Sequence, residues 1–289
     1  MNRFFAVFKN IYVQFVLLIV YIPLVVGAIW SFNDNPDKGG FLTTTWTETT
    51  TKHWKSVLEA GRDIALVNTI IIAVTVSVIV IFLSLITSYA MYRQKNKMVK
   101  RALNATMNIP IINPDNITAI GLVLIFGLLF GIISSDSEGM PRLIAAHTVM
   151  ALPYGISLMY PRSEKFNNNL FEASQDLGHS KLSSWFKTYF VYMMPSIVMT
   201  FVVSTVLSMD DFIITRTVSN TSTLGLKLYE GSFEPWSLVF GAILLMTILV
   251  VNVIYVSVKV NATKKPKLNI KKTTEGQKSK LAFELSWKK

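Results

Sequence analysis

The sequence has 289 residues, with 28 Lys and Arg against 17 Asp and Glu, no cysteine and a positive mean hydropathy. Charged residues make up 16% of it, whereas an ordinary soluble domain carries about 25%, so the composition argues against a water-soluble globule. Without cysteine the chain forms no disulfide, thiolate nucleophile or cysteine-ligated metal site. The net charge of +11 fits either nucleic acid or an anionic membrane surface as a partner.

Long apolar runs dominate the chain. A helix needs roughly 20 apolar residues to cross a hydrocarbon core of about 30 Å, and six runs approach or exceed that length. Soluble helices keep a polar stripe, which six such runs in succession lack. We therefore predict an all-α, polytopic membrane protein whose transmembrane domain covers residues 1–258. The predicted spans are about 11–32, 64–92, 102–133, 143–160, 191–209 and 237–258.

The first run follows Arg3 and Lys9, as the apolar core of a secretory signal peptide would. It is longer than the 7 to 15 residues of a signal core, and a convincing small-residue cleavage site is lacking. We expect it to be a retained first helix.

Positive charge predicts the orientation. Of the 28 Lys and Arg, only 7 fall in the alternate segments 33–63, 134–142 and 210–236, and 21 fall in the others. Because Lys and Arg favour the cytoplasmic side in short loops, we expect both termini to be cytoplasmic. Residues 259–289 hold ten Lys against two Glu, which predicts a flexible basic tail that binds anionic lipid headgroups. Nucleic acid is not implied.

Asp115 is an unusual charge, since it lies inside the third apolar run, 14 residues beyond Arg101. Pro110 and Pro114 would interrupt a helix there and free backbone groups that need a partner or a water-filled cavity. One interpretation is a broken helix whose carboxylate lines a pathway. The other is that the third span starts only at Ile117, so that Asp115 is a helix-start residue.

A second acidic site ends the fifth run, where Ser208 and Met209 precede Asp210 and Asp211. Carboxylates at a helix C-terminus are disfavoured by the dipole by about 0.3 to 1 kcal/mol each, and a cationic ligand would offset that cost. The alternative is a solvated outer loop that ends a helix. Trp54, well away from a span end, is a candidate for a cation–π contact with an organic cation.

The loop 161–190 between the fourth and fifth spans predicts helix, tight turn and helix on the cytoplasmic face. The first helix is expected from about Arg162 to Leu177, and Gly178 is a natural stop because glycine accepts the left-handed conformation. The alternative is an amphipathic connection on the membrane surface. This stretch resembles the EAA loop of ABC importer permeases, with Glu172, Ala173 and Gly178 at the matching positions and Ser174 in place of the second Ala.

Several segments resemble the second permease subunit of spermidine/putrescine ABC importers over residues from about 12 to 258. They read VYIPLVVGAIWSFND, INPDNITAIGL, HTVMALPYGISLMYPR and VLSMDDFIITRTVSNTSTLGLKLYEGS. The resemblance implies a type I ABC importer permease fold with six transmembrane helices. It also implies that the substrate contacts include Asp210, Asp211, Asp115, Ser208 and Trp54, and that Glu172, Ala173, Ser174 and Gly178 couple the chain to an ATPase.

The function implied by this resemblance is ATP-driven import of polyamines across a bacterial plasma membrane. The implied partners are a second, different permease subunit, two cytoplasmic ATP-binding subunits and an extracellular or periplasmic polyamine-binding protein. No G-x-x-x-x-G-K-[ST] motif occurs in the chain, so the phosphate cradle of an ATPase is absent. We expect a non-enzymatic subunit without a cofactor, with ATP and Mg bound by the partner ATPase.

Two other functions compete with this one. An ABC permease for an iron complex, sulfate or an amino acid would share the architecture, and an ion-coupled secondary transporter would need no EAA loop. A metal-dependent enzyme is disfavoured because His53, His147 and His179 fall in three separate segments, which predicts no metal site. We interpret His147 as a packed, hydrogen-bonded helix residue.

Overall fold

A computed structural model describes residues 2–34, 45–112, 115–130, 139–230 and 234–263. These residues are almost entirely helical, with one isolated antiparallel bridge between Asn33 and Thr49. The chain divides into two compact units. The first comprises Met1–Pro36, Leu42–Lys55 and Glu234–Lys289, and the second comprises Asp37–Phe41 and Ser56–Phe233.

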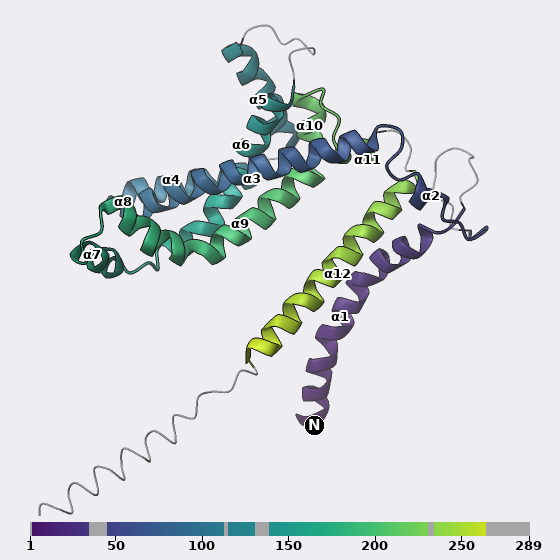
Figure 1. The fold of residues 1–289 in the computed structure, drawn as a ribbon, viewed down its shortest axis with the longest axis horizontal. Coiled ribbons are helices and arrows are strands. Elements are labelled where there is room, and N and C mark those ends of the chain that lie inside the picture. Colours follow the sequence, from purple (N-terminus) through teal and green to yellow (C-terminus); the bar gives the residue numbers. More distant parts are fainter. Residues whose placement is uncertain (1, 35–44, 113–114, 131–138, 231–233, 264–289) are drawn as a thin grey trace, which may run out of the picture. The chain divides into compact units, whose positions relative to one another are not determined.

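The first unit is built on a pair of long helices, α1 (Asn2–Trp30) and α12 (Trp236–Thr263), which pack against one another (Figure 1). The short helix α2 (Lys52–Lys55) packs against α12. Asn33 anchors the segment after α1, because its amide donates to Thr45 O at 3.1 Å and accepts from Thr47 N at 2.9 Å.

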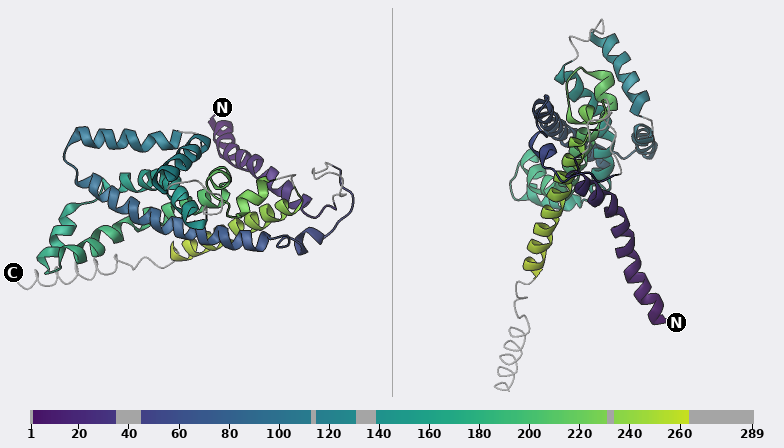
Figure 2. Two further views of the ribbon diagram at one scale, coloured as in Figure 1. Left: turned by 90° about the horizontal axis from the view of Figure 1, so that it is seen from above. Right: turned by 90° about the vertical axis from the view of Figure 1, so that its right-hand side faces the viewer.

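The second unit is organised around α3 (Arg62–Arg93), α6 (Met140–Ser163) and α9 (Val191–Asp210), which pack against one another (Figures 1 and 2). Small side chains let these helices come close, and Ser77 Oγ lies 2.8 Å from Thr205 Oγ1 between α3 and α9. The apolar core between α3 and α6 comprises Ile72, Val76, Val80, Leu143 and Ala151. This three-helix bundle supports the two regions described below, one at each end of α9.

The third apolar run forms two helices, α4 (Lys97–Ile112) and α5 (Asp115–Phe130). Residues 113–114 between them lie outside the described residues, and Pro110, which was expected to interrupt a helix, lies within α4. Two short helices follow the end of α9, namely α10 (Ile213–Val218) and α11 (Leu224–Tyr229). Helix α5 packs on α10 and α6 through the buried side chains of Ala119, Leu122, Ala146, Ile214 and Val218.

At the other end of α9, the chain forms α7 (Asn168–Asp176), α8 (Lys181–Ser184) and the π-helical segment η2 (Trp185–Phe190). Segment η2 runs directly into α9, so that one helical stretch covers Lys181–Asp210. An aromatic cluster holds this end together, since the Tyr189 ring lies 4.8 Å from that of Tyr89 and 5.2 Å from that of Phe166.

Within the described residues, every predicted apolar run overlaps a helix, and several of these helices extend beyond the expected span. In the described part of the chain, three helical stretches are long and apolar enough to cross a membrane, Arg62–Arg93, Met140–Ser163 and Lys181–Asp210. Three shorter apolar helices accompany them, Leu18–Trp30, Asp115–Leu129 and Trp236–Val250. Helix α1 starts at Asn2, before the expected span of 11–32, and α12 continues to Thr263, beyond the expected span of 237–258. Most of the predicted tail, residues 264–289, lies outside the described residues.

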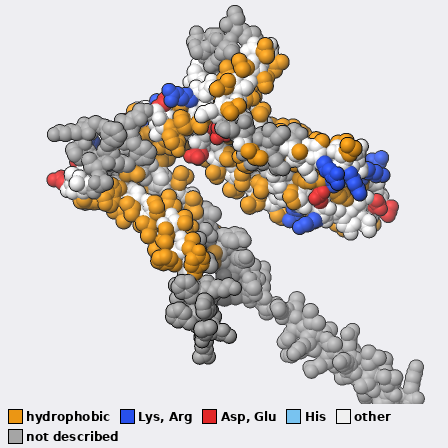
Figure 3. All heavy atoms as spheres, turned by 180° about the vertical axis from the view of Figure 1, so that it is seen from behind, with side chains coloured by type: hydrophobic (Ala, Val, Ile, Leu, Met, Phe, Trp, Pro, Cys, Tyr) orange, Lys and Arg blue, Asp and Glu red, His pale blue; other side chains and the backbone are white. Residues whose placement is uncertain are grey.

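The surface of the second unit separates apolar from charged side chains. Apolar side chains cover the lengths of the helices, and charged ones gather at the end where α7 and α8 lie (Figure 3). The exposed cations there include Arg93, Lys95, Lys97, Arg101 and Lys181. This distribution suits a helical bundle surrounded by hydrocarbon, with its basic end in water.

Candidate functional site

Three acidic residues that are far apart in the sequence meet in one pocket of the second unit. The pocket has a volume of about 300 Å³ and lies where α9 ends, against α5 and α6. Asp115, Asp210 and Asp211 all line it. The sequence predicted each of them as a substrate contact without indicating that they share a site.

Aromatic side chains form part of the same pocket, and the sequence reasoning missed them. The pocket is lined by Tyr154 of α6, by Phe212, which precedes α10, and by Tyr229 at the end of α11. The rings of Phe212 and Tyr229 stack with their centroids 4.5 Å apart. Met150, Val206, Leu207 and Ile213 complete the lining. No local sequence signal marks these aromatics, because Tyr154 and Tyr229 reach the pocket only through the packing of α6 and α11. A cavity with carboxylates and ring faces is suited to an organic cation.

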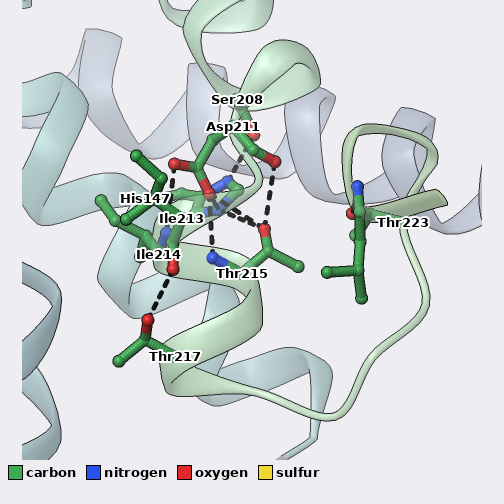
Figure 4. A network of polar contacts seen from close by, with 9 residues as sticks. His147, Ser208, Asp211, Ile213, Ile214, Thr215, Thr217 and Thr223 are labelled. Atoms are coloured by element: carbon green, nitrogen blue, oxygen red, sulfur yellow. Dashed lines mark hydrogen bonds and ion pairs between the residues drawn. The ribbon is translucent and has the colours of Figure 1, made fainter. Parts of the chain in front are cut away.

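Asp211 is locked in place by hydrogen bonds (Figure 4). Its Oδ2 accepts from Thr215 N at 2.9 Å and from Thr215 Oγ1 at 3.0 Å, and its Oδ1 accepts from Ile214 N at 3.3 Å. The carboxylate therefore satisfies amide groups at the start of α10, as an N-terminal capping residue does. His147 Nε2 lies 3.1 Å from Oδ2, and the Asp211 side chain is only 5% exposed.

Ser208 and His147 form the buried side of this network. Ser208 Oγ lies 2.8 Å from His147 Nδ1, and both residues are buried. The prediction that His147 is a packed, hydrogen-bonded helix residue is confirmed. Ser208 contacts this histidine and is not among the residues that line the pocket, so its role as a direct substrate contact stays a prediction.

Asp210 and Asp115 differ from Asp211, since both are exposed. Asp210 is the last residue of α9, and its carboxylate has no hydrogen-bond or ion-pair partner within the described part of the chain. Asp115 is the first residue of α5, where the helix dipole favours a negative charge. The two interpretations of Asp115 are thus compatible: it starts a helix and it lines a cavity.

Trp54 belongs to the first unit, in which its contacts are structural. Its Nε1 donates to Ser31 Oγ at 3.2 Å, and its ring stacks on Phe32 with centroids 5.1 Å apart. The predicted substrate role of Trp54 gains nothing from these contacts, because they are made with the segment that follows α1.

The predicted helix, turn and helix after α6 are present, with a corrected start. Helix α6 continues to Ser163 and α7 begins only at Asn168, so the expected helix from Arg162 is wrong. Asn167 caps α7 by accepting from Asn169 N at 3.0 Å. The start was misplaced because a helix-compatible composition does not reveal a capping asparagine inside a run of three.

Gly178 ends α7 in the left-handed conformation that the sequence predicted, with φ of +84°. Gly178 N donates to Gln175 O at 2.8 Å and His179 N donates to Ser174 O at 3.3 Å, which is the Schellman pattern of a helix C-terminus. Of the other predicted coupling residues, Glu172 and Ala173 are exposed, whereas Ser174 is buried against the bundle. Ser174 is therefore placed to pack within the chain.

Large apolar side chains stand out from this turn. Leu177 is 80% exposed and Leu182 is 71% exposed. Beside them lies a pocket of about 530 Å³ between α3, α7 and α8, whose lining includes Arg93, Phe171 and Trp185. Exposed leucines at a basic end of the bundle are a feature of interaction surfaces.

Comparisons with known proteins give the family. No protein-family model matches the chain. The spermidine/putrescine transport system permease protein PotC homolog of Mycoplasma genitalium is 31% identical over 253 residues, 85% of this chain and 88% of that protein. The spermidine/putrescine transport system permease protein PotC of Escherichia coli K12 is 28% identical over 215 residues, 73% of this chain and 77% of that protein.

A solved structure shares the fold. It is the crystal structure of a bacterial ABC transporter involved in the import of the acidic polysaccharide alginate, with a TM-score of 0.61 and 15% identity, covering 89% of this chain and 96% of the other. That likeness extends to the fold alone. Identity of 31% over most of both chains, however, is enough to assign the family, and the chain belongs to the PotC-type spermidine/putrescine transport system permeases.

Proposed function

We propose that this chain is a permease subunit of an ATP-driven importer of polyamines and forms half of the translocation pore. The observation that carries the proposal is the pocket in which Asp115, Asp210 and Asp211 meet a wall of aromatic rings. The relatives' names support a polyamine as the substrate. The fold alone does not set the sign of the substrate's charge, since the alginate importer handles an acidic polymer on a similar fold.

The chemistry of the pocket favours a molecule with several ammonium groups. At an effective dielectric near 20, each carboxylate–ammonium contact at 4 Å is worth about 4 kcal/mol before desolvation. The stacked rings of Phe212 and Tyr229 suit the methylene chain between ammonium groups and add cation–π attraction. An anion such as sulfate would meet repulsion from the same carboxylates.

The topology that goes with this function has six transmembrane helices and both termini in the cytoplasm. The spans belong to a transmembrane domain over residues 1–258, and residues 259–289 form the basic cytoplasmic tail. The protein is then a multi-pass component of a bacterial plasma membrane. The basic end of the second unit (Figure 3) supports this orientation.

Coupling to ATP hydrolysis takes place at the turn between α7 and α8. Glu172, Ala173 and Gly178, together with the exposed Leu177 and Leu182, dock onto a cytoplasmic ATPase. ATP and Mg bind to that partner, whose closure moves the permease as a rigid body. A second permease subunit completes the pore, and an external binding protein delivers the polyamine.

Transport by the complete complex in proteoliposomes tests the proposal. Labelled spermidine or putrescine is expected to accumulate only with ATP, and an excess of unlabelled polyamine is expected to suppress it, whereas sulfate and amino acids are not. ATP-dependent uptake of one of those other solutes, without polyamine uptake, would refute the polyamine assignment. Uptake that follows an ion gradient without ATP would refute the importer class.

A further inference from the structure

His147 is a fully buried histidine that joins three helices at the rim of the acidic pocket. It belongs to α6, is 0% exposed, and contacts Ser208 of α9 and Thr215 of α10, besides Asp211 between them (Figure 4). Any buried imidazole needs polar partners for its ring nitrogens, and here the partners belong to the end of α9, the start of α10 and the acid between them.

The partners fix the proton on the imidazole ring. An ionised carboxylate can only accept a hydrogen bond, so His147 Nε2 carries the hydrogen that it shares between Asp211 Oδ2 at 3.1 Å and Thr215 Oγ1 at 3.2 Å. Nδ1 lies 2.8 Å from the Ser208 hydroxyl, which can either donate or accept. Both ring nitrogens are thus engaged, and the contact with Ser208 helps to fix the orientation of the ring.

These contacts are unequally shared between the two oxygens of Asp211. Oδ2 has Thr215 N, Thr215 Oγ1 and His147 Nε2 within 3.1 Å, whereas among the described residues Oδ1 has a single hydrogen-bond contact, Ile214 N at 3.3 Å. Oδ1 is thus the oxygen with acceptor capacity to spare. The carboxylate cannot rotate without breaking several bonds to Oδ2.

We infer that His147 is a positioning residue for substrate recognition: supported by Ser208, it holds Asp211 so that one carboxylate oxygen stays engaged with the protein and the other remains available to an ammonium group. This inference rests on the proposed function of the pocket. It gives the two neighbouring acids different tasks, because Asp210 has no such partner in the described chain. Asp211 is a fixed acceptor, and Asp210 is a movable one.

The test compares His147→Leu with His147→Gln in the complete complex in proteoliposomes. The Gln amide can place an N–H near the position of Nε2, whereas Leu fills similar space without a donor. We expect His147→Leu to raise the KM for spermidine or putrescine about tenfold, as loss of a hydrogen bond to a charged group would, and His147→Gln to stay within about threefold of the wild type. Ser204→Ala serves as the matched control, because within the described part of the chain that buried α9 hydroxyl donates only to backbone carbonyls of its own helix.

An Asp211→Asn background separates positioning from mere packing. If His147 acts through Asp211, adding His147→Leu to Asp211→Asn raises KM no further. An equal additional rise, or an unchanged KM in His147→Leu alone, overturns the inference while wild-type polyamine uptake leaves the proposed function standing. A wild-type complex that transports no polyamine refutes the proposed function itself. Co-purification of the subunits verifies that each variant is assembled.

Discussion

The pocket at the end of α9 and the turn between α7 and α8 depart from ordinary burial rules in opposite ways. At the pocket, the carboxylate of Asp211 is almost completely buried and His147 is buried with it. At the turn, Leu177 and Leu182 are largely exposed. A buried charge needs partners, which Asp211 finds in its own chain, whereas the exposed leucines find little burial there. Under the proposed function, the first region binds a charged substrate and the second is covered by a partner protein.

The largest effects are expected when the two adjacent acids of the pocket, Asp210 and Asp211, are neutralised one at a time. We expect Asp210→Asn and Asp211→Asn each to lower polyamine uptake about tenfold or more, because each removes a carboxylate–ammonium contact. Asp211→Asn should also lower the stability of the complex by about 1 to 3 kcal/mol, since the donors of His147 and Thr215 lose a charged acceptor. Uptake and thermal unfolding of the purified complex measure both effects.

Asp63→Asn is the matched control, because that exposed acid in the first turn of α3 does not line the pocket. Normal uptake in both single variants would contradict the proposal that the pocket binds a cationic substrate. Equal destabilisation by Asp210→Asn and Asp211→Asn would contradict the difference between them, in which the Asp211 carboxylate is held by hydrogen bonds and the Asp210 carboxylate is not.

The proposed docking role of the turn between α7 and α8 can be tested by substituting Gly178. A β-branched residue in the left-handed region is a strong outlier, and the conformation costs an ordinary residue about 1 to 2 kcal/mol. We expect Gly178→Val to lower both ATPase co-purification and uptake several-fold, and Gly178→Asn, which tolerates this conformation, to retain most of both. If the two variants behave alike, the backbone conformation of Gly178 is not what the docking requires.

The smallest expected effect concerns the ion pair between Lys100 Nζ and Glu164 Oε1, 2.8 Å apart, which joins α4 to the end of α6. The hydrogen bond from Lys100 holds the pKa of Glu164 below its usual value. Because this pKa is lowered in the folded state, the pair stabilises the protein at neutral pH, and that contribution disappears as the pH falls through the folded pKa.

Glu164→Gln should therefore cost less than about 1 kcal/mol near pH 7 and nothing once the wild-type carboxyl group is protonated. Thermal unfolding at several pH values, with Lys100→Met and the double variant to complete the cycle, measures it. A cost that grows toward acidic pH would have the wrong sign for this explanation.

Much of the helical architecture could be predicted from the sequence, because six long apolar runs leave few alternatives to a helical membrane protein. Helix ends were less predictable where the signal was a cap within polar residues, as at Asn167. Asp115 stood out individually because it is a charge within an apolar run, whereas a substrate role for Asp210 and Asp211 was indicated by the family resemblance. Their meeting with Tyr154 and Tyr229, and the lock on Asp211, depend on how α5, α6, α10 and α11 pack, which no local pattern encodes.

The π-helical segment η2 has a consequence for the pocket at the far end of the same helical stretch. Successive residues of an α-helix are separated by about 100° around the axis, so one added or removed residue turns everything beyond it by that angle. The wider turns of Trp185–Phe190 accommodate extra chain locally. The direction in which the far end of α9 faces therefore depends on the number of residues and on the helical pitch between the α7–α8 turn and Ser208. Inserting or deleting one residue within α9 would rotate Ser208 away from His147 and Asp210 away from the pocket.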